Sequence, residues 1–147
     1  MLLPSEIRNH TSLCCSHVWR SIGTHIWLEF GVPKITMLRS GRRSVTGEMT
    51  LHVSGYNWRL MLEKQCVLNS DTVTDENFDT IGKQWIVGNP VFIDVMESDK
   101  LELSFSKEAI LQIFPSDEEG DDSEVSLKLP NGQWWEFDFD LGWHLSS

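Results

Sequence analysis

One segment near the end of the chain places carboxylates at regular spacing beside a tryptophan. Apolar and polar residues alternate over Trp134–Asp140, which predicts a strand. Its core face would carry Trp135, Phe137 and Phe139, and its other face Trp134, Glu136, Asp138 and Asp140. Carboxylates on every second residue lie about 7 Å apart and repel one another, so we expect solvent, a cation or a basic partner to offset them. Because Trp is enriched at the energetic centres of interfaces, this face is a candidate surface for a basic protein.

A second acidic cluster precedes this segment by a few residues. It consists of Asp117, Glu118, Glu119, Asp121 and Asp122, with Gly120 among them. Carboxylate oxygens bind divalent cations, but this run lacks the Asp-x-Asp-x-Asp-Gly spacing and the distant Glu of a calcium loop. We therefore predict no metal here and expect a solvated loop that attracts a basic partner over long range.

The segment Cys14-Cys15-Ser16-His17, with His10 nearby, has the residue types of a zinc site. Tetrahedral zinc sites use two closely spaced pairs of ligands, however, and only Cys66 follows. A cysteine nucleophile would need a histidine and an orienting group beside it in space, and no glycine pattern points to one. We therefore predict structural cysteines, no metal and no cofactor.

Three cysteines, two of them adjacent, make a poor disulfide framework. The first ten residues also lack a basic start followed by an apolar run, so we read no signal peptide. Reduced thiols and a cytoplasmic location are the resulting prediction.

Two other functions stay open. Any two of the 22 acidic residues could form the acid–base pair of a small β-fold enzyme, although so many acids make this pattern unspecific. A structural domain that self-associates through an exposed strand edge is the other alternative.

The basic cluster Arg39, Arg42 and Arg43 lies in a Gly/Ser loop, where RNA or an acidic partner could contact it. We favour an intramolecular or surface role for these arginines, and a monomer for the free protein.

The chain has 147 residues and a net charge of −10, which suits a single domain over residues 1–147. Residues 1–64 carry 8 basic and 4 acidic side chains, whereas residues 65–147 carry 4 basic and 18 acidic ones. The negative charge therefore belongs to the second half. Such acidity argues against a nucleic-acid partner, and no apolar run is long enough for a membrane helix.

The elements that must position these residues are mostly strands. Regular alternation predicts a mainly β fold, an antiparallel sandwich or strongly bent sheet of about eight or nine strands. The alternating segments are residues 26–30, 49–53, 58–62, 91–95, 101–105, 125–129 and 135–139. A short strand at 34–38 and a short apolar run at 109–114 complete the nine. Ser54–Asn57 and the Asn-Gly segment Pro130–Gln133 are read as hairpin turns. One short helix is expected over residues 74–82, capped by Thr74 and ended by Gly82.

The two halves of the chain also resemble each other weakly. Residues 26–63 and 101–139 align at offsets of 75 and 76, as in Glu48–Val53 against Glu124–Leu129, with the helical segment 74–82 between them. This pattern predicts two repeated hairpin units. Unrelated amphipathic hairpins would look alike for the same reason, so both interpretations stay open.

The Trp-rich segments Ile26–Gly31 and Gly132–Glu136, in a small acidic chain, resemble the immunity proteins of bacterial toxin–immunity systems, including those of contact-dependent growth inhibition. The resemblance spans roughly residues 20–145 and rests on general character, because these families share no motif and differ in fold. It implies a non-catalytic inhibitor. Such a protein covers a basic toxin domain, often a nuclease, with an acidic surface at or near the toxin's active site.

Overall fold

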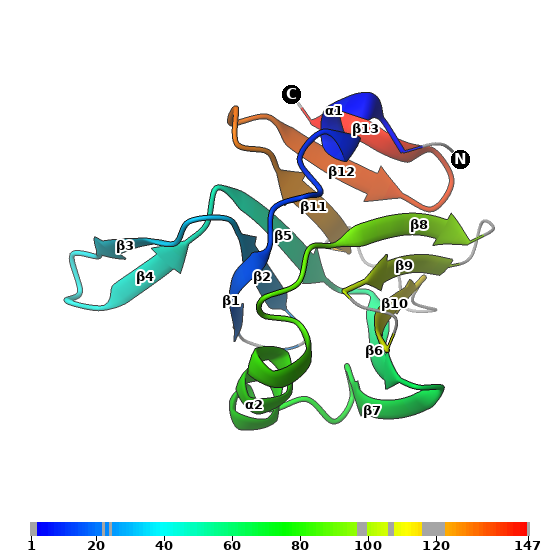
Figure 1. The fold of residues 1–147 in the computed structure, drawn as a ribbon, viewed down its shortest axis with the longest axis horizontal. Coiled ribbons are helices and arrows are strands. Elements are labelled where there is room, and N and C mark those ends of the chain that lie inside the picture. Colours follow the sequence, from blue (N-terminus) through cyan, green and yellow to red (C-terminus); the bar gives the residue numbers. More distant parts are fainter. Residues whose placement is uncertain are drawn as a thin grey trace.

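Two antiparallel sheets face each other in the computed structural model, which describes residues 3–21, 23, 25–96, 100–105, 108–115 and 123–146 (Figure 1). The six-stranded sheet has the order β1 (Cys15–Arg20), β2 (Ile26–Phe30), β5 (Met49–Ser54), β11 (Glu124–Lys128), β12 (Trp134–Asp138), β13 (Gly142–Ser146). The five-stranded sheet has the order β7 (Gln65–Asn69), β6 (Asn57–Leu62), β10 (Ala109–Phe114), β9 (Lys100–Ser104), β8 (Phe92–Met96). The predicted mainly β antiparallel fold is confirmed.

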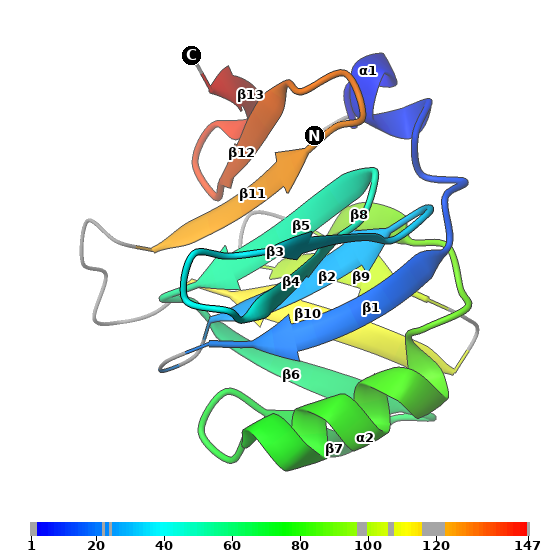
Figure 2. The ribbon, with the colours of Figure 1, turned by 90° about the vertical axis from the view of Figure 1, so that its left-hand side faces the viewer.

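A two-stranded hairpin stands apart from both sheets. It pairs β3 (Lys34–Met37) with β4 (Arg43–Thr46), and we call residues 32–46 the arm. Figure 2 views the six-stranded sheet face-on, with the arm in front of it. The strand predicted at 34–38 is present as β3, and the predicted basic Gly/Ser loop is short, because Arg43 and Ser44 already belong to β4.

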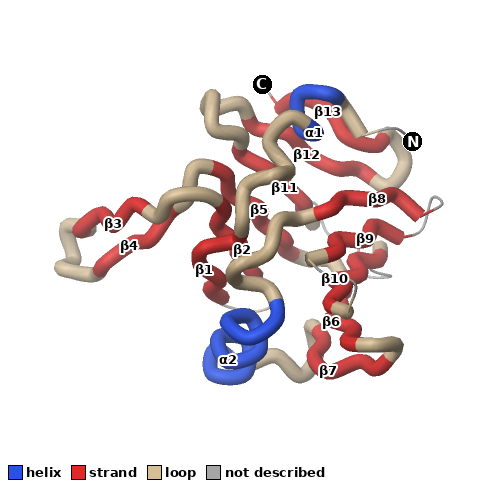
Figure 3. Tube along the Cα trace, viewed as in Figure 1, coloured by secondary structure: helices blue, strands red, loops and turns tan. Residues whose placement is uncertain are grey.

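The main helix, α2 (Asp75–Trp85), packs against the edge strand β1 (Figure 3). Its predicted cap is confirmed: the amide of Asn77 donates to the Thr74 hydroxyl at 3.1 Å, and the Thr74 amide donates to the Asn77 side chain at 2.7 Å. The predicted end at Gly82 is wrong. Gly82 lies inside the helix, at a position where any larger residue would collide with Val18 of β1. A one-turn helix, α1 (Ser5–Arg8), was not predicted.

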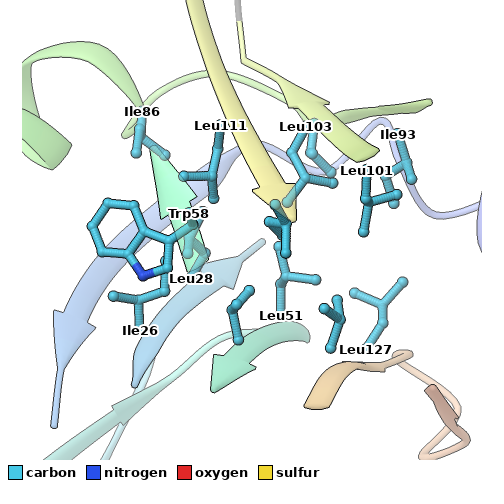
Figure 4. Packing of buried hydrophobic residues seen from close by; sticks show 14 of the residues in the cluster. Ile26, Leu28, Leu51, Trp58, Ile86, Ile93, Leu101, Leu103, Leu111 and Leu127 are labelled. Atoms are coloured by element: carbon cyan, nitrogen blue, oxygen red, sulfur yellow. The ribbon is translucent and has the colours of Figure 1, made fainter. Parts of the chain in front are cut away.

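The core lies between the sheets and follows from the alternation (Figure 4). Every second residue of β9 and β10 is buried, and the facing positions of the six-stranded sheet are buried as well. Fully burying a Leu, Ile or Phe side chain contributes about 1.5–3 kcal/mol, so this layer dominates stability. Its largest members include Ile26, Leu28, Leu51, Trp58, Leu101, Leu103 and Leu111.

One predicted hairpin is present and the other is wrong. The Pro130–Gln133 turn joins β11 to β12, which pair with each other. The chain at Ser54–Asn57 instead crosses from β5 in one sheet to β6 in the other. The internal repeat stays a prediction, and its matching segments β6 and β12 lie in different sheets.

The described chain has thirteen strands rather than eight or nine. The strands that the alternation missed are β1, β4, β7 and β13. In β1 the pairing slips between Cys15 and His17, and such a bulge interrupts the period of two that marks a strand in sequence. Within the described residues, no helix is long and apolar enough to cross a membrane.

Candidate binding surface

The face of the six-stranded sheet that points away from the core, here called the outer face, carries the candidate residues of the Trp134–Asp140 segment. Strand pairing aligns one residue from each strand in a row across it. From β1 to β13 this row reads Trp19, Trp27, His52, Ser126, Glu136 and His144. The face is therefore aromatic at one end and acidic at the other.

The aromatic end is a stack of flat rings. Trp19 lies on Trp27 with ring centroids 4.7 Å apart, and Trp27 lies on His52 with centroids 3.6 Å apart. His25 Nδ1 is 3.1 Å from His52 Nε2. Burial, and secondly the neighbouring His25, lower the pKa of His52 to about 4. His52 is therefore uncharged at neutral pH and stacks as an apolar ring.

The acidic end contains the predicted strand β12. As predicted, Phe137 and Phe139 are buried, Trp135 packs partly against the core, and the other side chains point outward. Trp134 is 39% exposed, with Lys128 Nζ 5.6 Å from its ring centroid. This is cation–π distance, so Lys128 steadies the indole without covering it.

The carboxylates of β12 are offset by groups of the protein itself. Glu136 Oε2 is 3.6 Å from His144 Nε2, and Glu136 Oε1 accepts a hydrogen bond from the Ser146 hydroxyl at 3.3 Å. Asp138 Oδ1 accepts the amides of Asp140 at 2.7 Å and of Leu141 at 3.2 Å. Asp138 therefore shapes the turn after β12, while Asp140 is exposed. Whether this face binds a partner stays a prediction.

The other predicted acidic site cannot be placed against this face. Asp117, Glu118, Glu119, Asp121 and Asp122 lie outside the described residues. The site geometry therefore rests on β12 and its neighbours.

The arm is attached to the outer face through two glutamates that the sequence analysis did not single out. Glu29 of β2 is completely buried, and its carboxyl group accepts three hydrogen bonds. The donors are the Gly47 amide at 3.1 Å, the Thr50 hydroxyl at 2.5 Å and Trp19 Nε1 at 3.4 Å. Glu48 accepts the amide of Val32 at 2.8 Å. Both strands at the base of the arm are thus held by a carboxyl group.

A sequence signal for Glu29 did exist. It is a lone acid in an otherwise apolar strand, and a Gly-Val-Pro break follows it. Buried acids require hydrogen-bond donors, so an acid at such a position indicates a tertiary contact. The sequence around Glu29 does not indicate that the donors are Trp19, Gly47 and Thr50.

The surface of the arm combines aliphatic and basic side chains. Val32, Ile35, Met37 and Leu38 are between 49% and 74% exposed. Lys34, Arg39, Arg42 and Arg43 are exposed beside them. In the part of the chain that the structure describes, none of these four cations forms an ion pair. The predicted surface placement of the arginines is therefore correct, but an intramolecular pairing is not observed.

Grooves flank the arm on both sides. One, of about 780 Å³, lies between the base of the arm, Lys128 and the β11–β12 turn. The other, of about 290 Å³, lies between His17 and Trp19 of β1 and the arm residues Leu38 and 42–45. The larger groove includes Lys128, which lies over the Trp134 ring, and so adjoins the acidic end of the outer face.

The cysteine segment offers little for nucleophilic chemistry. Cys15 is buried, and burial raises the pKa of its thiol to about 12, so the reactive thiolate is scarce at neutral pH. All three cysteines are free, and Cys14 and Cys66 are exposed. Among the described residues, no group of three or more His, Cys, Asp or Glu side chains is placed to hold a metal ion.

Comparison with protein-family models, with curated proteins and with solved structures gave no match.

Proposed function

We propose that this protein is a non-catalytic binding protein that neutralises a basic protein partner through the acidic end of its outer face. The observation that carries the proposal is the exposed Trp134 beside the outward-facing Glu136 and Asp138 and the exposed Asp140. An indole that is accessible yet held in place loses little freedom on binding, so it suits an interface anchor.

The charges around this anchor support a basic partner. Residues 134–146 contain three acidic side chains and neither Lys nor Arg. The rest of the second half adds to the same negative field, which speeds the approach of a positively charged protein and weakens with salt. Glu136 makes its contacts to His144 and Ser146 on a half-exposed surface, so a Lys or Arg of a partner can replace them.

The more specific proposal is that the partner is a bacterial toxin domain and that the protein is its immunity protein. The support is the small acidic β fold together with a surface of carboxylates that imitates the charge of a nucleic-acid substrate. The alternative of a carboxylate-using enzyme has no comparable support.

Affinity capture followed by titration tests this proposal. Immobilised wild-type protein is expected to retain a basic protein from the native cells. The variant E136Q/D140N should bind that protein at least about tenfold more weakly, since each charge-assisted contact contributes about 1.5–3 kcal/mol. The matched control is E63Q/E76Q, which removes two exposed acids elsewhere. Equal affinity for the three proteins would show that β12 is not the interface.

A growth assay tests the toxin proposal. We expect production of the captured protein in a host to stop growth, and co-production of the wild-type protein to restore it. Rescue should fail with E136Q/D140N. A captured protein that does not impair growth would refute the immunity role while leaving basic-partner binding intact.

A further inference from the structure

Exposed apolar side chains concentrate in two places on the described surface. Nine large hydrophobic residues are exposed there, and seven of them belong to these two places. Four lie on the arm: Val32, Ile35, Met37 and Leu38. Three lie on β12, on β13 and in the turn between them: Trp134, Leu141 and Leu145. We call residues 134–146 the acceptor edge. Surfaces of this kind are usually covered by another protein.

The two places carry opposite charge. The arm, residues 32–46, has four basic side chains and no acidic one. The acceptor edge has Glu136, Asp138 and Asp140 and no Lys or Arg. Leu145 pairs with Trp135 on the core side of the sheet, so Trp134 and the turn residue Leu141 form the apolar part of the acceptor edge beside its carboxylates. The two places are therefore apolar patches of opposite charge.

We propose that two copies of this chain associate, with the arm of each copy docked on the acceptor edge of the other. Within one copy the arm starts from the ends of β2 and β5, and β11 separates these strands from β12. The arm also projects outward from the sheet (Figures 1 and 2). A second copy placed with its outer face toward the first meets both surfaces at once. A two-fold axis then repeats the contact, giving a closed dimer.

The anchoring of the arm favours this docking. Glu29 and Glu48 hold both strands of its base, so the arm is oriented before any partner arrives. Pre-oriented elements lose less conformational entropy on binding.

RNA and lipid surfaces fit the arm less well than a second copy. The arm contains no aromatic residue on which bases could stack, and the chain as a whole repels polyanions at a net charge of −10. The outer face carries the acceptor edge as well as the arm, so binding this face to an anionic membrane would bring three carboxylates close to negative charge. Only a protein surface with both apolar and acidic groups satisfies the arm, and the chain itself carries one.

This proposal departs from the expectation of a monomer and does not depend on the proposed function. It connects with that function at one point, because a second copy's arm and a basic partner would compete for Trp134, Glu136 and Asp140. Arm variants that cannot dimerise should therefore still bind the partner.

A charge exchange tests the dimer. The arm variant is R39E/R42E/R43E, which leaves the arm with one basic and three acidic side chains. The edge variant is E136K/D140K, which spares Asp138 because its side chain shapes a turn. Sedimentation equilibrium at low salt should find dimers for the wild type and monomers for each variant alone. An equal mixture of the two variants should form a heterodimer, since both contacts are then complementary again. K64E/K83E, with two exposed lysines reversed elsewhere, should dimerise like the wild type.

Several results would overturn the proposal. The wild type could stay monomeric at about 0.5 mM and low salt, a concentration at which a millimolar association is already visible. The variant mixture could stay monomeric while circular dichroism shows both proteins folded. Binding of the arm to RNA or to anionic vesicles, with no self-association, would assign it a different occupant. If dimerisation fails but E136Q/D140N still loses the basic partner, the dimer is refuted and the proposed function stands.

Discussion

Removal of the Glu29 carboxyl group should loosen the arm and destabilise the whole fold. In E29A the Gly47 amide, the Thr50 hydroxyl and Trp19 Nε1 lose their acceptor inside a site with no exposure at Glu29. Each buried donor left unsatisfied costs about 1–3 kcal/mol. Trp19 is partly exposed and can bond to water, so we expect a total loss of about 2–5 kcal/mol. Urea unfolding followed by tryptophan fluorescence measures it as a lower midpoint with an unchanged m-value.

Two further variants separate the hydrogen bonds from the loss of volume. E29Q keeps the shape and one acceptor oxygen, but its amide nitrogen faces a donor, so we expect a loss of about 1–2 kcal/mol. E48A removes a single bond at an exposed position, which should cost less than about 1 kcal/mol. In E29A the arm amides should also exchange their hydrogens faster than in E48A. If the free energy of unfolding of E29A lies within about 0.5 kcal/mol of the wild-type value, Glu29 does not anchor the arm.

Three other predictions follow from single residues. G82A should destabilise the protein by about 1–3 kcal/mol in thermal unfolding, although Ala is the better helix former, because its methyl group would collide with Val18; equal or higher stability would refute the close contact. His52 has a pKa of about 4 in the fold against an ordinary 6.5, so its contribution to stability is complete above pH 6.5 and is lost as the pH falls toward 4. The free energy of unfolding from urea titrations over this range should fall by up to about 3 kcal/mol more in the wild type than in H52Q. Parallel curves for the two proteins would contradict this prediction. A thiol reagent should titrate two cysteines in the native protein and three after unfolding, because Cys15 is buried and its pKa is raised to about 12; rapid reaction of three native thiols would contradict this assignment.

Several features were determined by local sequence alone. Alternation at β9 and β12 identified both the strands and their buried faces, because successive side chains of a strand point to opposite sides. Thr74 with Asn77 determined where the helix starts, and Asn131-Gly132 determined the hairpin between β11 and β12. These signals act over two to four residues, so they need no knowledge of the rest of the fold.

The tertiary structure decided which elements meet. Alternation marks the inner face of β5 and of β6 but carries no information on which sheet each strand joins, and an expected hairpin is in fact a crossing between sheets. Gly82 reads locally as a helix end, yet its place inside the helix depends on Val18, which is distant in sequence. Likewise, Glu29 becomes an anchor only when Trp19, Gly47 and Thr50 surround it. The candidate residues of β12 could be predicted because they share one strand, whereas the row from Trp19 to His144 exists only through pairing of strands that are distant in sequence.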